Sequence, residues 1–255
     1  MRYFESTAYA EYCKRVYGCD MKQMGMISVD ELSLLEQEIK LPTNSRILDM
    51  GCGAGGISLY LSEHYQSEVV GIDYDDEAIE YANKNKDNKA LQFHAMDYNE
   101  IQYDDATFDM VCFIDTLYFT FTRDKLRSLL DKCYTMLKDN GKLVVFWTNL
   151  PQMFEMNDPA AVNTEVGKWG VEKSIAMNFV DLTHKHRQFW AKAYAVAGEM
   201  DDMLQNEIPD EWEHLRNERK IVSGLCKKGD GGGIFRWLYI FTKTKGFGKK
   251  NLCSG

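Results

Sequence analysis

A glycine-rich segment behind an acidic residue is the part of the sequence best suited to chemistry. Residues 51–56 read Gly-Cys-Gly-Ala-Gly-Gly, and Asp49 stands two positions before them. This spacing satisfies both GxGxxG and GxGxG, which many nucleotide-binding sheets place at the turn from a strand into a helix. A helix N-terminus attracts negative charge, so such a turn commonly holds the pyrophosphate of a dinucleotide. The glycines alone therefore leave the bound nucleotide undecided.

Two carboxylates near this segment favour a different ligand. Asp49 would be poorly placed beside a pyrophosphate, but it suits a ligand with an amino group and a sulfonium cation, such as S-adenosylmethionine. Asp73 ends an apolar run, where one carboxylate can accept hydrogen bonds from both hydroxyls of a ribose. NAD enzymes share that second contact. A nicotinamide-dependent reductase is therefore the weaker alternative, supported only by the literal GxGxxG.

Three segments in order resemble the first motifs of class I S-adenosylmethionine-dependent methyltransferases. They are residues 47–56, 70–73 and 95–97, and the similarity extends over roughly residues 28 to 150. In that family the residue at Asp97 typically meets the adenine amino group, and the strand ending at Asp115 lies under the methionine part. The resemblance implies a donor site formed by these residues: Asp49, Gly51, Cys52, Gly53, Gly55, Asp73, Tyr74, Met96, Asp97, Ile114 and Tyr9.

Alternating helical and strand patterns position this segment in a doubly wound α/β fold. Apolar spacing predicts helices at 5–17 and 28–40, the second behind Ser28 as a possible cap. The following segments alternate: strand 47–48, helix 55–65, strand 68–73, helix 76–85, strand 91–94, strand 108–114, helix 123–138 and strand 142–148. This alternation predicts a Rossmann-like sheet with helices on both faces.

The rest of the chain predicts a helical insertion before a last strand. We expect a helix at 158–168 that ends at Trp169-Gly170, a strand within 171–182, helices at 184–206 and 210–226, and a strand at 234–242. This order resembles small-molecule methyltransferases of the sarcosine and dimethylglycine type, which carry a helical cover there. We expect one domain, 1–255, with N-terminal lid helices (1–40), a donor-binding core (46–150), the cover (183–228) and the last strand (234–243).

The acceptor is expected beyond the carboxyl ends of the strands, where open α/β sheets bind ligands. Residues at these positions are Asp115, Tyr118, Trp147 and Asn149, and the cover can bring His186 above them. Methyl transfer is an in-line displacement that needs alignment more than a base, so Asp115 and Tyr118 are only weak candidates for catalysis.

These features predict an enzyme that methylates a small molecule. An amine or amino-acid-like nitrogen is the preferred acceptor, by family likeness. Two alternatives are O-methylation of a carboxyl or hydroxyl group and a donor-binding module without turnover. Nucleic acid is disfavoured, because residues 115–118 read Asp-Thr-Leu-Tyr in place of Asn/Asp-Pro-Pro-aromatic, and because the net charge is −9.

Composition bounds the remaining possibilities. The 255 residues are 45% hydrophobic, and no apolar run is long enough to span a bilayer. Seven cysteines form no CxxC pair and are expected to be reduced, and the N-terminus lacks the pattern of a signal peptide. We expect a cytoplasmic protein with no membrane or nucleic-acid partner, as a monomer or homodimer. No metal is expected, and His184 and His186 are expected to be exposed on a helix.

Overall fold

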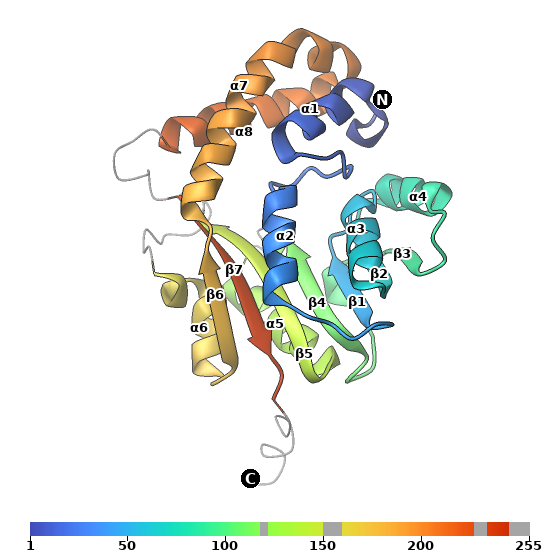
Figure 1. Cartoon of the computed structure of the whole chain (residues 1–255), viewed down its shortest axis with the longest axis vertical. Helices are drawn as coiled ribbons and strands as arrows, with labels where there is room; N and C mark the ends of the chain where they lie inside the picture. Colours follow the sequence, from blue (N-terminus) through green and yellow to red (C-terminus); the bar gives the residue numbers. More distant parts are fainter. Residues whose placement is uncertain (118–121, 150–159, 227–233, 245–255) are drawn as a thin grey trace.

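The computed structural model describes residues 1–117, 122–149, 160–226 and 234–244. Within these residues one seven-stranded sheet carries helices on both faces (Figure 1). The strands are β1 (Arg46–Met50), β2 (Glu68–Asp73), β3 (Leu91–Ala95), β4 (Phe108–Ile114), β5 (Leu137–Asn149), β6 (Ala176–Asp181) and β7 (Phe235–Thr242). The α-helices are α1 (Thr7–Tyr17), α2 (Val29–Glu38), α3 (Gly56–Tyr65), α4 (Asp76–Asn85), α5 (Arg123–Met136), α6 (Glu165–Glu172), α7 (Thr183–Glu207) and α8 (Pro209–Cys226). Among the described helices, none has the length and apolar character that a bilayer span requires.

The sheet has the strand order β3-β2-β1-β4-β5-β7-β6. Strands β1 to β5 are parallel to one another, whereas β7 is antiparallel to both β5 and β6. The chain order therefore reverses between β1 and β4, which is where open sheets of this kind bind ligands. The predicted fold class, a doubly wound Rossmann-like sheet with helices inserted before the last strand, is confirmed.

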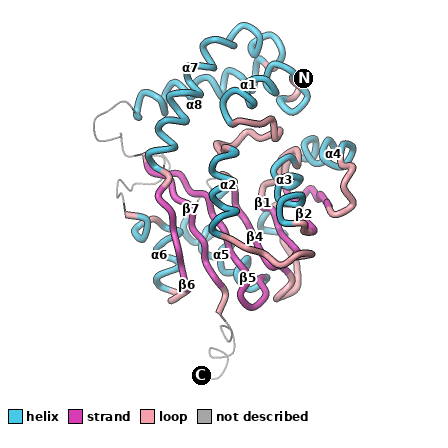
Figure 2. Tube along the Cα trace, in the orientation of Figure 1, coloured by secondary structure: helices cyan, strands magenta, loops and turns pink. Residues whose placement is uncertain are grey.

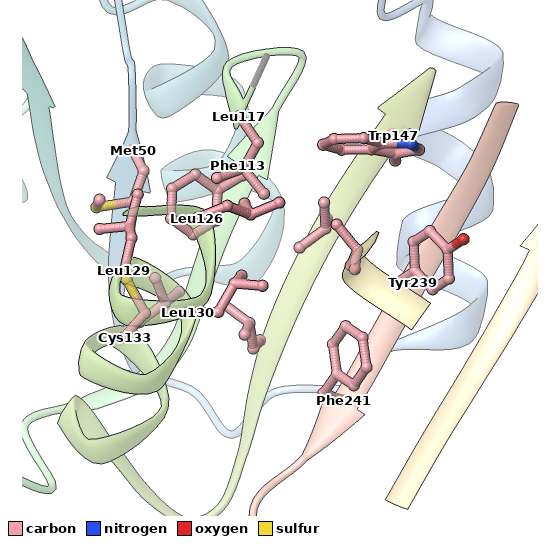
Figure 3. Close-up of a cluster of buried hydrophobic side chains, with 14 of the residues drawn as sticks. Met50, Phe113, Leu117, Leu126, Leu129, Leu130, Cys133, Trp147, Tyr239 and Phe241 are labelled. Atoms are coloured by element: carbon pink, nitrogen blue, oxygen red, sulfur yellow. The ribbon is translucent and has the colours of Figure 1, made fainter. Parts of the chain in front are cut away.

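Alternation along the strands divides the core between the two faces of the sheet. Met50 and Phe113 point to the face covered by α5, where Leu126 and Leu130 lie beside them, and Trp147 lies farther along this face, toward Tyr239 (Figure 3). The intervening strand residues pack on the opposite face against α2 and α3. Each fully buried side chain of this size stabilises the fold by about 1.5–3 kcal/mol. The two packed faces hold the carboxyl ends of the parallel strands β1 to β5 at one edge of the sheet.

A third apolar cluster lies beyond that edge and is built from helices. Helix α1 packs on α7, and α7 packs along α8 (Figures 1 and 2). Tyr12 of α1 meets Trp212 of α8 edge to face. The buried Arg219 guanidinium donates to the hydroxyl groups of Tyr12, at 2.5 Å, and Tyr17, at 3.1 Å. The first helix is therefore joined to the helical insertion and forms one layer with it.

Three local predictions differ from the structure. The predicted helix at 158–168 begins at Glu165 and continues through Gly170 to Glu172. A Cβ on Gly170 would lie 2.4 Å from Phe241, so this glycine permits close packing and does not end the helix. Strand β5 begins at Leu137 because this residue pairs with Phe108, and α5 ends correspondingly early. Residues 158 and 159 lie outside the described residues.

Candidate functional site

The glycine-rich turn between β1 and α3 has a backbone that only glycine readily adopts. Gly51, Gly53 and Gly55 have φ values of +83°, +51° and +84°. A Cβ on Gly51 would lie 2.4 Å from the Thr116 methyl carbon and 2.5 Å from the Tyr98 hydroxyl oxygen. The turn is therefore held both by its dihedral angles and by tight packing.

Most amides of this turn already donate hydrogen bonds within the protein. The Gly51 and Cys52 amides donate to the Ile72 carbonyl at 2.7 and 3.0 Å. The Gly53 amide donates to Asp73 Oδ2 at 2.8 Å, and the Gly55 amide donates to the Cys52 carbonyl at 3.0 Å. Because these donors are used, the turn offers few amides to a pyrophosphate. Its hydrogen bonding disfavours the dinucleotide alternative.

The carboxylate of Asp73 lies at the end of β2, beside this turn. Its Oδ2 accepts from Gly53 and its Oδ1 accepts from the Asp75 amide at 3.0 Å, which fixes the orientation of the group. The Tyr3 hydroxyl oxygen is close by, 3.4 Å from the position a Cβ would take on Gly53. Burial, and then the charge of Asp73, raise the pKa of Tyr3, so its hydroxyl stays protonated.

Asp49 is almost fully buried under the turn. It is 2% exposed, and its carboxylate accepts from the Ser58 hydroxyl at 2.6 Å and from the Cys112 thiol at 3.8 Å. Burial raises the pKa of Asp49 to about 6, and the charge of Asp73 adds to the increase while the Ser58 hydrogen bond opposes it. No Lys or Arg in the described part of the chain forms a salt bridge with either carboxylate. The edge is consequently negative and suited to a cation.

The other residues expected at the donor site surround the same edge. The Met96 amide donates to the Asp73 carbonyl at 2.8 Å, which brings the segment after β3 against the end of β2. Asp97 is exposed, and Tyr74 is 73% exposed. Ile114 is buried at the end of β4. These positions are compatible with contact to one bound nucleoside, and their roles stay predictions.

Tyr9 points into the helical layer and away from the solvent. It is 1% exposed, and its hydroxyl donates to the Gln23 carbonyl at 3.1 Å. The segment between α1 and α2 instead approaches the turn, since a Cβ on Gly56 would lie 1.8 Å from the Met21 carbonyl oxygen. This segment also reaches the end of β4, where the Met26 amide donates to Asp115 Oδ2 at 2.8 Å.

Asp115 belongs to a buried ionic cluster at the ends of β4 and β5 and the start of β7. Its Oδ1 accepts from Arg236 Nη1 at 2.5 Å, and the same Nη1 donates to the Thr148 hydroxyl at 2.8 Å. Arg236 Nε donates to Glu31 Oε1 of α2 at 2.7 Å. Burial raises the pKa of Glu31, although the Arg236 charge opposes this. Asp115 therefore links strands and helix at the place where an acceptor was expected, and its backbone is left-handed, with φ of +59°.

The structure describes three of the four remaining acceptor candidates. Trp147 is 1% exposed in β5, and Asn149 ends β5 opposite Phe235 of β7. Tyr118 lies outside the described residues. His186 is 1% exposed, so its predicted exposure was wrong, and its Nε2 accepts from the Trp190 indole at 2.8 Å. Burial, and then the Arg236 charge, lower the pKa of His186 well below its usual value.

Several residues of this edge were absent from the sequence prediction. They are Tyr3, Glu31, Tyr98 and Arg236. Arg236 had a detectable signal, since a lone basic residue in an apolar strand demands a buried partner. Nothing local indicated the others, because their positions depend on contacts between distant segments. Within the described residues, no group of three or more His, Cys, Asp or Glu side chains could hold a metal ion.

Comparison with known proteins gives consistent likenesses. A family model described as a methyltransferase domain matches residues 47–141. A phosphoethanolamine N-methyltransferase of Plasmodium falciparum is 31% identical over 109 residues, which are 42% of this chain and 41% of that protein. The chain thus matches about two fifths of that relative's length.

Among the solved structures that share the fold are two methyltransferases. Phosphoethanolamine N-methyltransferase 2 of Haemonchus contortus, solved with phosphomonomethylethanolamine and S-adenosylhomocysteine, has a TM-score of 0.72 at 14% identity, covering 95% of this chain and 59% of that one. A Galdieria sulphuraria structure described as a sarcosine dimethylglycine methyltransferase also has a TM-score of 0.72, at 12% identity, and covers 95% and 99%. At these identities the likeness concerns the fold.

Proposed function

Residues 47–141 form a class I S-adenosylmethionine-dependent methyltransferase domain, and from this premise we propose that the chain transfers a methyl group from S-adenosylmethionine to the nitrogen of a small amine. The family comparison supports the reaction class. The observation that carries the proposal for this chain is the pair of carboxylates, Asp49 and Asp73, at a turn where four amides already donate within the protein. That arrangement suits a cationic nucleoside and disfavours a pyrophosphate.

The described residues fit the donor in three respects. Asp73 is oriented by two backbone amides, so its remaining lone pairs can accept from ribose hydroxyls. Asp49 supplies buried negative charge without a cationic partner among the described residues. The protonated Tyr3 hydroxyl near Gly53 can donate a hydrogen bond. When bound, S-adenosylmethionine supplies a methyl group activated by a sulfonium sulfur.

The contribution of this chain to the reaction is alignment and exclusion of water. The acceptor nitrogen must approach in line with the methyl carbon and the sulfur, and a C–N bond forms as the C–S bond breaks. The sulfur keeps the electron pair of the broken bond, and the methylated nitrogen releases a proton to solvent. The buried edge between β4, β5 and α7 would hold the amine in its neutral form.

A neutral amine also agrees with the state of His186. Trp190 donates to Nε2 of His186, and an indole N–H can only donate, so the proton of the neutral imidazole lies on Nδ1. In this state neither ring nitrogen is available to remove a proton from a hydroxyl acceptor. His186 is therefore a poor general base, and this disfavours O-methylation of a hydroxyl. A carboxylate acceptor, which needs no base, is the second candidate.

The proposal is tested by calorimetric titration with S-adenosylmethionine, S-adenosylhomocysteine and NADH. We expect both sulfur nucleosides to bind and NADH to show no heat of binding. Asp73→Ala is expected to abolish detectable binding, whereas Glu80→Ala, which removes an exposed carboxylate from α4, should leave the dissociation constants within about twofold. Binding of NADH without binding of either sulfur nucleoside would overturn the proposal.

A further inference from the structure

The first turn of α7 carries two buried N–H groups that no described residue satisfies. His186 Nδ1 and Arg187 Nε have no hydrogen-bond partner within the described ranges, although both atoms are shielded from solvent. The His186 side chain is 1% exposed. Arg187 forms none of the salt bridges found in the described part of the chain. A buried donor without a partner destabilises the fold, so each of these groups requires an acceptor that the described residues do not supply.

Both groups are donors. The Trp190 indole donates to His186 Nε2 at 2.8 Å, which leaves the imidazole proton on Nδ1. The two ring nitrogens diverge, so the Nδ1–H bond points away from Trp190. The guanidinium of Arg187 has donors only and keeps its charge. The turn therefore combines one neutral donor with one charged donor.

The N-terminus of α7 adds backbone N–H donors beside the Asp181 carboxylate. The helix is 25 residues long, and Leu182 precedes it without a side chain that can cap it. Asp181 accepts from the Thr183 amide at 2.8 Å, while the next amides of a helix have no intrahelical acceptor. A helix N-terminus of this kind stabilises an anion, and the two unpartnered side chains provide an independent reason to expect one.

Backbone hydrogen bonds fasten this turn at the edge where the acceptor is expected. The Leu182 amide donates to the Arg236 carbonyl at 2.8 Å, and the Arg236 amide donates to the Thr183 hydroxyl at 3.1 Å. The Arg236 guanidinium extends from the same strand position to Asp115 at the end of β4. The backbone of the turn is thus fixed beside the strand position whose guanidinium reaches Asp115.

We propose that the first turn of α7 binds an anionic oxygen group of the acceptor through His186 and Arg187, so that the substrate is an amine that also carries a phosphate or a carboxylate. This inference rests on the proposed methyl transfer and specifies its substrate class. The arrangement is complementary to such a molecule: Arg187, His186 and the helix end favour its anion, and its neutral amine is left to face the methyl donor.

The test compares phosphoethanolamine, sarcosine and ethanolamine as acceptors, with release of S-adenosylhomocysteine as the measured product. Ethanolamine has no anionic group, and the other two distinguish a phosphate from a carboxylate. Arg187→Gln is expected to raise KM for the preferred anionic amine by roughly tenfold or more, because charged hydrogen bonds are the stronger ones. The value of kcat should change less than about threefold. Lys185→Gln, which removes an exposed charge from the same turn, should change neither constant.

Two substitutions of His186 separate recognition from structure. His186→Gln can still accept from Trp190 but loses the second donor, so KM for the anionic amine should rise. His186→Asn keeps a donor near the Nδ1 position and should restore part of the wild-type KM. In the wild-type protein, inorganic phosphate should shift the ¹⁵N and ¹H signals of the His186 Nδ1–H group, and in Arg187→Gln this shift should decrease.

The outcomes distinguish this inference from the proposed function. If S-adenosylhomocysteine binds and ethanolamine is methylated as efficiently as either anionic amine, the anion subsite is refuted and methyl transfer stands. The same conclusion follows if Arg187→Gln and Lys185→Gln have equal KM values. If S-adenosylhomocysteine does not bind, the proposed function itself fails. A phosphate-induced shift of His186 in the absence of turnover would support the subsite and count against the assigned reaction.

Discussion

Replacement of Asp49 by asparagine is expected to stabilise the ligand-free protein and to weaken donor binding. The pKa of Asp49 is about 6, against an ordinary value of 3.8. A carboxyl group with a raised folded-state pKa stabilises the fold only while it is protonated, and this contribution is lost as the pH rises through about 6. A difference of about two pKa units corresponds to roughly 3 kcal/mol at pH 8.

Urea denaturation, followed by tryptophan fluorescence at pH 8 and pH 5, measures this cost. Ionised Asp49 lowers the free energy of unfolding of the wild-type protein by roughly 3 kcal/mol at pH 8. At pH 5 this loss is about half as large, because Asp49 is then largely protonated in the folded state. Asparagine cannot ionise, so its advantage over aspartate should shrink by roughly 1.5 kcal/mol between pH 8 and pH 5. The comparison between two pH values cancels any constant effect of the amide group. Glu80→Gln, an exposed change in α4, is the matched control and should show no pH-dependent difference.

Calorimetric titration of the same variant gives the functional half of the prediction. Loss of a buried charge that faces a cationic ligand costs roughly 2 kcal/mol or more, or about thirtyfold in affinity. Wild-type affinity for S-adenosylmethionine should also fall as the pH drops below about 6, since binding must then displace a proton from Asp49, and the variant should lack this dependence. If Asp49→Asn leaves both the affinity and the pH dependence of stability unchanged, the reasoning about Asp49 is wrong.

Three further substitutions address other parts of the edge. Arg236→Met removes the cation between Glu31 and Asp115 and should lower the free energy of unfolding by about 3–5 kcal/mol, measured by urea denaturation. A loss below about 1 kcal/mol would contradict a stabilising role for this ionic cluster. Gly51→Ala would place a Cβ 2.4 Å from Thr116, so calorimetry should find the affinity for S-adenosylmethionine reduced more than about tenfold. An unchanged affinity would disprove the tight packing of the glycine-rich turn. Asn149→Ala should raise KM for the amine in a turnover assay while the dissociation constant of S-adenosylhomocysteine stays within about twofold, and equal effects on both would remove the distinction between donor and acceptor sides.

The local sequence pattern was sufficient to predict the donor-binding half of the fold. The predicted bounds of β2, α4 and β4 agree with the structure, because each is a short apolar or amphipathic run between clear turn signals. The glycine turn and its two carboxylates were also visible, since their spacing reflects the backbone of one strand-turn-helix unit. Such units depend on residues close in the sequence, and this is the information that a single sequence carries.

The acceptor half depends on contacts that sequence periodicity cannot reveal. Arg236 and Glu31 are 205 positions apart, and their pairing follows only when β7 is inserted between β5 and β6. His186 has helical spacing typical of an exposed face, yet the packing of α7 against β7 buries it. The approach of Tyr3 to Gly53 likewise requires the folded N-terminal segment. Long-range packing therefore decides which polar groups meet, and it overrides the local pattern.

The most direct test of the central claim is a mass-spectrometric turnover assay with S-adenosylmethionine carrying a trideuterated methyl group. Purified protein would be incubated with phosphoethanolamine, sarcosine and ethanolamine, with Asp73→Ala as the inactive control. We expect the mass increase of about 17 Da that one CD3 group gives when it replaces hydrogen on an amine, matched mole for mole by S-adenosylhomocysteine and absent with Asp73→Ala. Protein that binds the donor but forms neither labelled amine nor S-adenosylhomocysteine would contradict the assignment of small-amine methylation.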